Sequence, residues 1–388
     1  MPELVEILKA CVQHGASDIL IAPGEPPIAR IAGTLRKYSN LPKADAAECR
    51  RWIYSILDDR KRAEFEKKQD LDCAIHLPEA GRFRLNVFVQ VNGPAAALRV
   101  ISTKIPTPEE IKISPAIQNL ANLPRGLVLV TGPTGSGKTT TLACIIELIN
   151  QRYAKHILTV EDPIEYVYQN KLSIVNQRNV GLHTESWGSA VRAALRQNPD
   201  VILIGEMRDM ETMSMALAAA ETGHLCLSTL HTNDAPSTID RVINEFPLDA
   251  QNKVRSQIGS VLQAVVSQVL VPKGDGKGRA CAREVMLMTN GVAAQIREGK
   301  THELYSTIES GAERGMISLD KSLIELIKTG QISMEAALEK AHDPDSLKKL
   351  YKLQAAAPSA PGIDMSSLGD PLAAARAQAG QPHPTSTV

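Results

Sequence analysis

The chain has 388 residues, of which 43% are hydrophobic and 22% charged, and its 43 Lys and Arg side chains balance 43 Asp and Glu. This composition excludes a disordered or collagen-like chain, and the lack of a basic excess argues against a nucleic-acid partner. No apolar run approaches the roughly 18 residues of a membrane-spanning helix, so we expect no direct membrane insertion. The six cysteines form no C-x-x-C pair, which argues against a zinc ribbon or a redox motif.

Residues 1–100 are predicted to form an α+β domain. Apolar residues alternate with polar ones around Phe83, Leu85 and Val87, which is typical of a half-buried antiparallel strand. The predicted elements are a helix at 4–14, strands at 18–22 and 28–31, a helix at 46–67 and a strand-rich segment containing 81–90. A linker that contains prolines and threonine, 101–120, follows this region.

From residue 121 the pattern changes to short apolar strands that alternate with helices, which indicates an α/β domain with a mostly parallel sheet. The predicted strands are 127–131, 156–160, 201–205 and 225–230. Helical periodicity after Pro247, interrupted by a glycine-rich break at 274–278, predicts a helical C-terminal part that ends near residue 353. Residues 354–388 are rich in alanine and proline and are predicted to form a disordered tail.

Residues 132–139 read Gly-Pro-Thr-Gly-Ser-Gly-Lys-Thr and fit the phosphate-loop pattern G-x-x-x-x-G-K-S/T in full. An apolar strand precedes this segment and a helix follows it, so backbone N–H groups and the helix N-terminus are expected to face the phosphates. Lys138 is expected to reach the β- and γ-phosphates of ATP, and the Thr139 hydroxyl to take a place on Mg²⁺. The predicted nucleotide-binding residues are Gly132, Pro133, Thr134, Gly135, Ser136, Gly137, Lys138, Thr139 and Thr140. The alternative is a glycine-rich turn with a chance lysine.

Three of the predicted strands end in polar residues, namely in 161–165, in 206–209 and at His231. Because ligands bind at the carboxyl ends of strands in such sheets, we expect several carboxylates and an imidazole beside the triphosphate. Hydrolysis requires this chemistry, since one carboxylate can accept a proton from water and another can hold the hydration shell of the metal. In the alternative, Glu161 and Asp162 cap the next element, Glu206 pairs with Arg208, and the histidines are structural.

The chain resembles the type IV pilus retraction ATPases, the PilT/PilU family of secretion-superfamily hexameric ATPases, from about residue 4 to residue 353. The marks of this resemblance are Gly15-Ala16-Ser17-Asp18, the phosphate loop, the acidic box 161–165, an atypical Walker B segment at 201–206 with Met207-Arg208-Asp209, the histidine box 222–231, and Ile296-Arg297-Glu298-Gly299-Lys300. One departure is His183, where the family commonly has an aspartate.

The resemblance implies a PAS-like N-terminal domain joined to a RecA-like P-loop ATPase domain, assembled as a homohexamer. It implies that Glu206 is the Walker B carboxylate, which shares Mg²⁺ with Thr139, and that Glu165 is the general base. It further implies that His224 and His231 couple the γ-phosphate to the subunit interface, and that Arg82, Arg84 and Arg99 act on nucleotide at a neighbouring domain. In the alternative these arginines belong to a solvated strand face.

The function that the resemblance implies is an ATP-hydrolysing motor for pilus retraction and twitching motility. Such a motor is cytoplasmic and peripheral at the inner membrane, with a pilus platform protein and a paralogous retraction ATPase as partners. Segments such as 195–200 and 275–279 look more like the accessory PilU type, whereas Glu206-Met207-Arg208-Asp209 looks more like PilT. The alternatives are a pilus-assembly or type II secretion ATPase, and an accessory subunit that binds ATP but hydrolyses little. A small-molecule kinase is disfavoured, because no lid or acceptor pocket is apparent.

Overall fold

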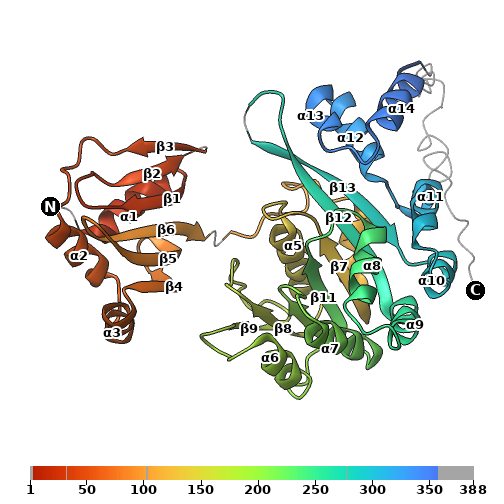
Figure 1. Ribbon diagram of the computed structural model, residues 1–388, viewed down its shortest axis with the longest axis horizontal. Coiled ribbons are helices and arrows are strands. Elements are labelled where there is room, and N and C mark those ends of the chain that lie inside the picture. Colours follow the sequence, from red (N-terminus) through yellow and green to blue (C-terminus); the bar gives the residue numbers. More distant parts are fainter. Residues whose placement is uncertain (1–2, 32, 102–103, 277, 357–388) are drawn as a thin grey trace, which may run out of the picture. The chain divides into compact units, whose positions relative to one another are not determined.

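Two β-sheets organise the part of the chain that the computed structural model describes, which comprises residues 3–31, 33–101, 104–276 and 278–356 (Figure 1). Residues 1–342 form one compact unit, and a second, short unit begins at Asp343. In the second unit the structure describes helix α14 (Pro344–Ala356). The tail predicted for 354–388 thus starts within a helix, and from residue 357 on it lies outside the described residues.

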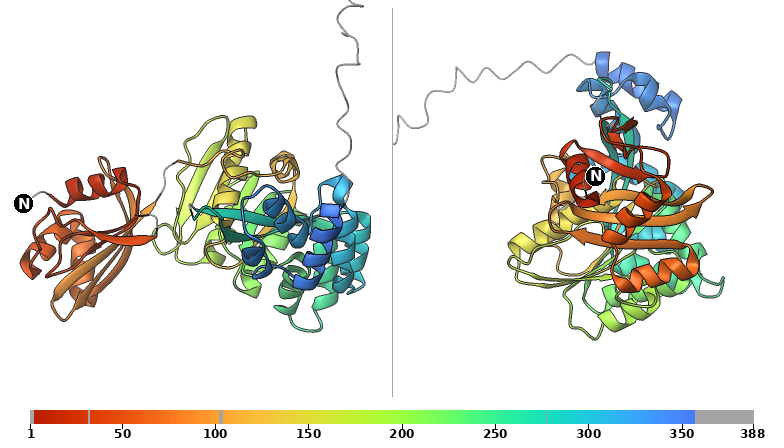
Figure 2. Two further views of the ribbon diagram at one scale, coloured as in Figure 1. Left: turned by 90° about the horizontal axis from the view of Figure 1, so that it is seen from above. Right: turned by 90° about the vertical axis from the view of Figure 1, so that its left-hand side faces the viewer.

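The first sheet has six strands in the order β3-β2-β1-β6-β5-β4, and its neighbouring strands are antiparallel. These strands are β1 (Ala16–Ile21), β2 (Ile28–Ile31), β3 (Thr34–Lys37), β4 (Asp70–Leu77), β5 (Gly81–Gln90) and β6 (Gly93–Ile101). The predicted alternation in β5 is confirmed, because Phe83, Leu85 and Val87 are buried while Arg84 is exposed. The buried side chains pack in one core with helices α1 (Leu4–Gln13), α2 (Ala46–Ser55) and α3 (Asp59–Lys68). Figure 2 shows these helices, coloured red to orange, beside the strands of the sheet. The opposite face of β5 carries Arg82, Arg84 and Asn86, together with the exposed Phe88.

The helix predicted at 46–67 is wrong as a single element, because the structure has two helices there, α2 and α3. Asp58 is the N-cap of α3, and its carboxylate accepts a hydrogen bond from the Lys61 backbone N–H at 2.9 Å. Ile56 and Leu57, between the helices, are buried. An N-cap aspartate starts a new helix, and here the bend before it brings two more apolar side chains into the core.

The second sheet has seven strands in the order β13-β12-β7-β11-β10-β8-β9. Among the described strands of this sheet, the β12–β13 pair is antiparallel and the other pairs are parallel. The strands are β7 (Gly126–Thr131), β8 (His156–Glu161), β9 (Ile174–Asn179), β10 (Val201–Ile204), β11 (Leu225–Leu230), β12 (Leu262–Pro272) and β13 (Arg279–Leu287). The four strands predicted from the sequence correspond to β7, β8, β10 and β11 to within one residue at each end. This agreement confirms the α/β class of the region.

Hydrophobic cores lie on both faces of the second sheet. On one face Leu127 and Leu129 of β7 pack in a cluster with the helices α7, α8 and α9. On the other face Val128 and Val130 pack with α5 and with the short helix α4. The helices up to this point in the chain are α4 (Pro115–Gln118), η1 (Asn119–Asn122), α5 (Lys138–Arg152), α6 (Trp187–Ala194), α7 (Met210–Glu221), α8 (Ala235–Asn244) and α9 (Gln251–Val261). Burial on both faces explains why these strands are continuous apolar runs.

The prediction of a helical region directly after Pro247 is wrong for residues 262–287, which form the β12–β13 hairpin (Figure 1). Ala264, Val265, Val266 and Ser267 are all buried, so this part of β12 has no polar face to reveal a period of two. A short apolar run of this kind cannot be distinguished from a buried helix by periodicity alone. Helices do follow the hairpin, at α10 (Asn290–Arg297), η2 (Thr301–Glu303), α11 (Leu304–Ser310), η3 (Ala312–Arg314), α12 (Leu319–Lys328) and α13 (Met334–Leu338).

Candidate functional site

The phosphate loop connects β7 to α5, at the carboxyl end of a central strand. Gly132, Gly135 and Gly137 have φ angles of 139°, 76° and 89°, a region that favours glycine. A Cβ atom on Gly132 would lie 2.2 Å from the backbone oxygen of Gln268, so no larger residue fits there. The loop therefore turns tightly into the first turn of α5, where the N–H groups of a helix start can bind an anion.

Lys138 is buried at the start of α5, with 9% of its surface exposed. Its ammonium group donates hydrogen bonds to the backbone oxygens of Gly132 at 2.8 Å and Pro133 at 3.2 Å. Burial lowers the pKa of Lys138, and the nearby carboxylates of Glu206 and Glu165 oppose this shift. The loop thus surrounds a positive charge that is expensive to bury without an anionic ligand.

Glu206 follows β10 and has two partners. One carboxylate oxygen lies 3.0 Å from Nε2 of His231, and the other lies 2.8 Å from a guanidinium nitrogen of Arg208. Nδ1 of His231 lies 3.5 Å from the Lys138 ammonium. A neutral imidazole with its proton on Nε2 satisfies both contacts, because it donates to Glu206 and accepts from Lys138. Glu206 therefore pairs with Arg208, as the alternative expected, and it also lies near the phosphate-loop lysine Lys138.

A cavity of about 180 Å³ lies between the phosphate loop and the ends of β8, β10 and β11. Its polar lining comprises Thr134, Gly135, Lys138, Thr139, Glu161, Asp162, Glu165, Glu206, Thr229 and His231. The structure thus brings Glu165, Glu206 and His231 to the same cavity as Lys138. Thr139 and Glu206 offer a hydroxyl and a carboxylate there, the oxygen donors that Mg²⁺ prefers.

Glu161 is the most deeply buried acid of this cavity, with 4% of its surface exposed. Its Oε1 accepts hydrogen bonds from the Thr159 hydroxyl at 2.6 Å and from the Gln177 side chain at 3.2 Å. Burial raises the pKa of Glu161 to about 7, so this carboxyl group is partly protonated at neutral pH. In the alternative from the sequence, Glu161 caps the next element, whereas in the structure it is a buried acid at the end of β8 that lines the cavity.

His224 and His231 stand at opposite ends of β11. The backbone oxygen of His224 accepts a hydrogen bond from Gly126, the first residue of β7, whereas the phosphate loop follows the last residue of β7. Nδ1 of His224 lies 3.0 Å from the Ala219 carbonyl oxygen, at the C-terminal end of α7. The structure therefore does not bring His224 to the phosphate cavity of its own chain.

The three predicted arginines lie on the polar face of the six-stranded sheet. Arg84 and Arg99 are register partners in the β5–β6 pair, and Arg82 lies two residues before Arg84 on β5. Arg84 forms a bidentate pair with Asp72, and the Arg99 Nε lies 3.0 Å from Asp18. Hydrogen bonding to Asp72 raises the pKa of Arg84. Both arginines are exposed and already paired within their own sheet.

A larger cavity of about 450 Å³ lies beside the phosphate loop, and sequence reasoning did not find it. It is lined by residues of 110–117, by Ser136, Gly137, Thr140 and Thr141, and by residues of β12, β13 and α12. Ser136 Oγ and Arg283 Nε, at this cavity, are buried without a hydrogen-bond partner among the described residues. No sequence signal marks the cavity, because its walls come from four separate segments.

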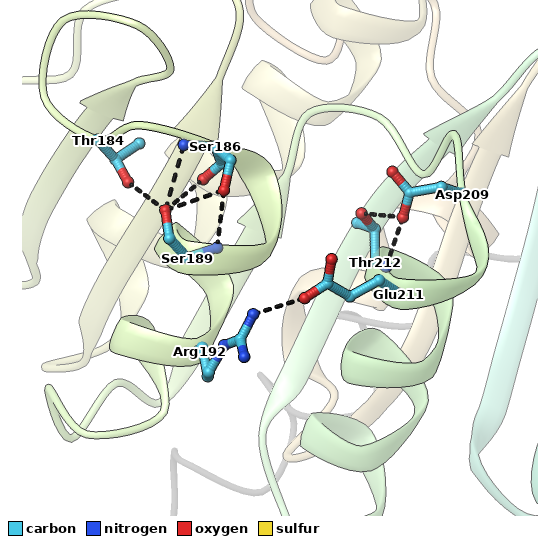
Figure 3. A network of polar contacts seen from close by, with 7 residues as sticks. All are labelled: Thr184, Ser186, Ser189, Arg192, Asp209, Glu211 and Thr212. Atoms are coloured by element: carbon cyan, nitrogen blue, oxygen red, sulfur yellow. Dashed lines mark hydrogen bonds and ion pairs between the residues drawn. The ribbon is translucent and has the colours of Figure 1, made fainter.

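The segment after Glu206 is fixed by contacts between α6 and α7 (Figure 3). Asp209 caps α7, since its carboxylate accepts hydrogen bonds from the N–H and the hydroxyl of Thr212, each at 2.8 Å. Glu211 pairs with Arg192 of α6 at 2.5 Å. A Cβ atom on Gly188 would lie 2.6 Å from the Glu211 carboxylate, so a larger residue there would displace this exposed side chain.

The residue that departs from the family pattern, His183, makes a local contact. Its Nδ1 accepts a hydrogen bond from the backbone N–H of Asn179 at 3.0 Å.

Over the described ranges, no group of three or more His, Cys, Asp or Glu side chains could by itself hold a metal ion. Likewise, none of the helices described is long and apolar enough to cross a membrane.

Comparison with known proteins agrees with these features. Residues 2–339 match the family "Type II/IV secretion system protein". The chain is 44% identical to the type IV pilus retraction ATPase PilT of Pseudomonas aeruginosa, over 89% of this chain and 99% of that protein. It is 40% identical to the type IV pilus ATPase PilU of the same organism, over 90% and 92% of the two chains.

A crystal structure of the pilus retraction motor PilT with bound ADP superimposes with a TM-score of 0.85 at 42% identity, covering 90% of this chain and 100% of that one. Both the sequence and the fold thus agree over nearly the full length of the relatives. The chain belongs to the Type II/IV secretion system protein family and, within it, to the PilT/PilU group of pilus retraction ATPases.

Proposed function

We propose that this protein is an ATP-hydrolysing motor that powers retraction of a type IV pilus. The observation that carries the proposal is the cavity in which Lys138 of the phosphate loop faces Glu206, Glu165 and His231. Family membership supports the same activity, since the relatives of similar length are pilus retraction ATPases. The reaction is transfer of the γ-phosphoryl group of ATP to water.

Lys138 binds the phosphates in this proposal. Its ammonium group exchanges the backbone oxygens of Gly132 and Pro133 for phosphate oxygens, which are stronger partners because they are charged. Thr139 and Glu206 would hold Mg²⁺, which neutralises charge on the phosphates when it is bound. The phosphate-loop glycines supply backbone N–H groups, and Thr140 continues the first turn of α5.

Glu165 is the proposed general base. It is exposed to solvent at the cavity, so a water molecule can reach it. Glu161 is less suited to this task, because it is buried and its Oε1 already accepts hydrogen bonds from Thr159 and Gln177. His231 orients Glu206 and lies within reach of Lys138, which suits a residue that responds to the γ-phosphate.

The nucleoside end of ATP occupies the 450 Å³ cavity in this proposal. That cavity is lined by Ser136, Gly137, Thr140 and Thr141, the residues that continue from the phosphate loop into α5. Arg283 lines it too, and a small shift of the Ser136 or Arg283 side chain would expose its unpartnered polar atom to the polar edge of a ribose or a base.

Assembly into a ring of six would complete the site. Arg82, Arg84 and Arg99 would then act on nucleotide held by another subunit, and His224 would act at a subunit interface. A PAS-like domain at 1–100, a linker at 101–120 and a RecA-like domain at 121–353 would be the units that move. An arginine stabilises the transferring phosphoryl group only when the parts close around it, so hydrolysis is coupled to motion.

The partners that we propose are other copies of the chain, a paralogous retraction ATPase and a platform protein of the pilus at the inner membrane. Contact with the membrane would be peripheral, from the cytoplasmic side. A second candidate function, an accessory subunit with little hydrolysis of its own, is favoured by the PilU-like sequence of segments 195–200 and 275–279.

Purified protein tests these proposals. Phosphate release should persist in Thr139→Ser, which keeps the hydroxyl, and fall by about a hundredfold or more in Glu206→Gln. Absence of release from the wild type, with ADP binding retained, would support the accessory role. Deletion in the source organism should leave surface pili in excess and abolish surface motility, whereas loss of pili would indicate an assembly ATPase.

A further inference from the structure

We propose that Gln268 and Arg283 form a cross-strand pair that positions the phosphate loop and ties it to the linker before the ATPase domain. The two residues are direct register partners in the antiparallel β12–β13 pair. Both line the 450 Å³ cavity. The inference rests on the proposed binding of nucleotide at the phosphate loop, and it adds two positioning residues outside every motif recognised in the sequence.

Gln268 supports the phosphate loop from β12 and is buried, with 2% of its surface exposed. Its side-chain nitrogen donates a hydrogen bond to the Ser136 carbonyl oxygen at 2.8 Å, and its side-chain oxygen accepts one from the Thr141 hydroxyl at 2.9 Å. One amide therefore joins the end of the loop to the first turn of α5.

The backbone of the same residue limits the other end of the loop. The carbonyl oxygen of Gln268 lies so close to Gly132 that a Cβ atom there would be 2.2 Å away. The loop thus contacts Gln268 at its first residue and near its last residue. A displacement of β12 at this position must move the phosphate loop, because a close-packed interior transmits small shifts.

Arg283 holds the linker. It is buried, with 8% of its surface exposed, and its guanidinium group donates hydrogen bonds to the carbonyl oxygens of Lys112 at 3.1 Å and Ile111 at 3.0 Å. A side-chain hydrogen bond of 2.6 Å from Lys112 to Gln331 holds the same segment. The middle of the predicted linker is therefore fixed to β13, the strand that pairs with β12.

A cavity lies between these contacts, and a ligand that bonds to either of two polar atoms there must first shift the side chain, because neither atom is exposed. Arg283 Nε and Ser136 Oγ are buried and lack a partner among the described residues. A nucleotide that bonds to either atom changes the contacts of the Gln268–Arg283 pair. This is because Ser136 is hydrogen-bonded to Gln268, and Arg283 is hydrogen-bonded to the linker. Occupancy of the site is thereby communicated to the linker through two adjacent strands.

The first test compares ADP affinity in the full chain. Gln268→Met keeps the side-chain volume but removes both hydrogen bonds, and we expect ADP to bind about tenfold more weakly. Thr141→Val removes one of the two bonds, and the expected loss is about threefold. Gln268→Glu keeps the acceptor for Thr141 but places a carboxylate against the Ser136 carbonyl, so its loss should exceed that of Thr141→Val.

Ser228→Ala is the matched control. Its hydroxyl is buried in the same sheet and donates to the Ile204 carbonyl oxygen at 2.7 Å, away from the phosphate loop. It should lower the melting temperature without changing ADP affinity. If Gln268→Met and Gln268→Glu both bind ADP as tightly as the wild type, the positioning role of Gln268 is wrong. Failure of the wild type itself to bind ADP would instead overturn the proposed function.

The second test measures tryptic cleavage after Lys112. We expect ADP to slow this cleavage in the wild type, and Gln268→Met to abolish that protection even at saturating ADP. Arg283→Met should increase cleavage several-fold and also weaken ADP binding about threefold, whereas Arg314→Met on the exposed η3 turn should change neither. Faster cleavage in Arg283→Met with unchanged ADP affinity would show that the linker and the loop are not coupled.

Discussion

The phosphate edge of the seven-stranded sheet and the polar face of the six-stranded sheet both carry charges, but they bury them to different degrees. Lys138 and Glu161 at the phosphate edge expose 9% and 4% of their surface. On the polar face, the side chains of Arg84 and Arg99 are 46% and 71% exposed. Buried charges have shifted pKa values and need a ligand or a proton, whereas exposed ion pairs contribute at most about 1 kcal/mol.

This difference in burial suggests that the two charged regions have different roles. Buried charges at the phosphate edge lower the free energy of unfolding, and their role is to bind a ligand. Charges on the polar face cost little to carry, and they can exchange one partner for another with a small change in free energy. Three substitutions test this comparison, and they are given from the largest expected effect to the smallest.

Lys138→Ala should have the largest effect on activity and almost none on stability. We expect phosphate release to fall by about a thousandfold or more, because the main cation for the phosphates is lost. The melting temperature measured without nucleotide should stay the same or rise, because a buried ammonium group is removed. The control is Lys155→Ala, which should keep the activity of the wild type. The ammonium group of Lys155 lies over the Tyr153 ring. A large drop in melting temperature for Lys138→Ala would contradict this assignment.

Glu161→Gln should change how stability depends on pH. The pKa of Glu161 is about 7 in the folded chain and 4.5 ordinarily, so the folded chain retains a proton that the unfolded chain loses between these values. The free energy of unfolding therefore falls as pH rises from about 4.5 to about 7 and then stays level.

The glutamine variant lacks this dependence. We expect it to be more stable than the wild type by about 1–3 kcal/mol near pH 8, with the gain disappearing towards pH 4.5. Chemical unfolding at several pH values measures this difference, and exposed Glu185→Gln should show no such trend. A loss of stability that is equal at every pH would mean that the carboxyl group is ionised throughout.

Arg84→Gln should have the smallest effect on the fold. Its pair with Asp72 is exposed, so we expect the free energy of unfolding to change by no more than about 1 kcal/mol. If Arg84 acts on nucleotide of another subunit, phosphate release by the assembled protein should nevertheless fall by about tenfold or more. Arg36→Gln, on the exposed strand β3, is the matched control. Equal activity in the two variants would leave Arg84 as part of a solvated face.

The sequence was most informative where one local pattern determines the geometry. The phosphate loop needs glycines, a strand before it and a helix after it, and all three are contiguous in the chain. The carboxyl ends of parallel strands meet at one edge, so Glu165, Glu206 and His231 could be placed together from strand order alone. His224 failed to join them because it precedes β11, whereas His231 follows it.

The sequence was least informative where distant segments meet. β12 is buried on both faces and gives no alternation, so its contacts with the phosphate loop could not be foreseen. Burial raises the pKa of Glu161 against the opposing effect of hydrogen bonds from β8 and β9, and the cavity near Arg283 is formed by segments far apart in the chain. Interactions of this kind require the tertiary structure.

The position of β7 within its sheet has a consequence for the order in which the chain can fold. Its two neighbours are β11 and β12, which are synthesised about a hundred residues or more after it. During synthesis, the strand that carries the phosphate loop cannot pair on both sides until residue 267 has left the ribosome. A polypeptide that stops before this residue therefore lacks one of the two strands that support the loop.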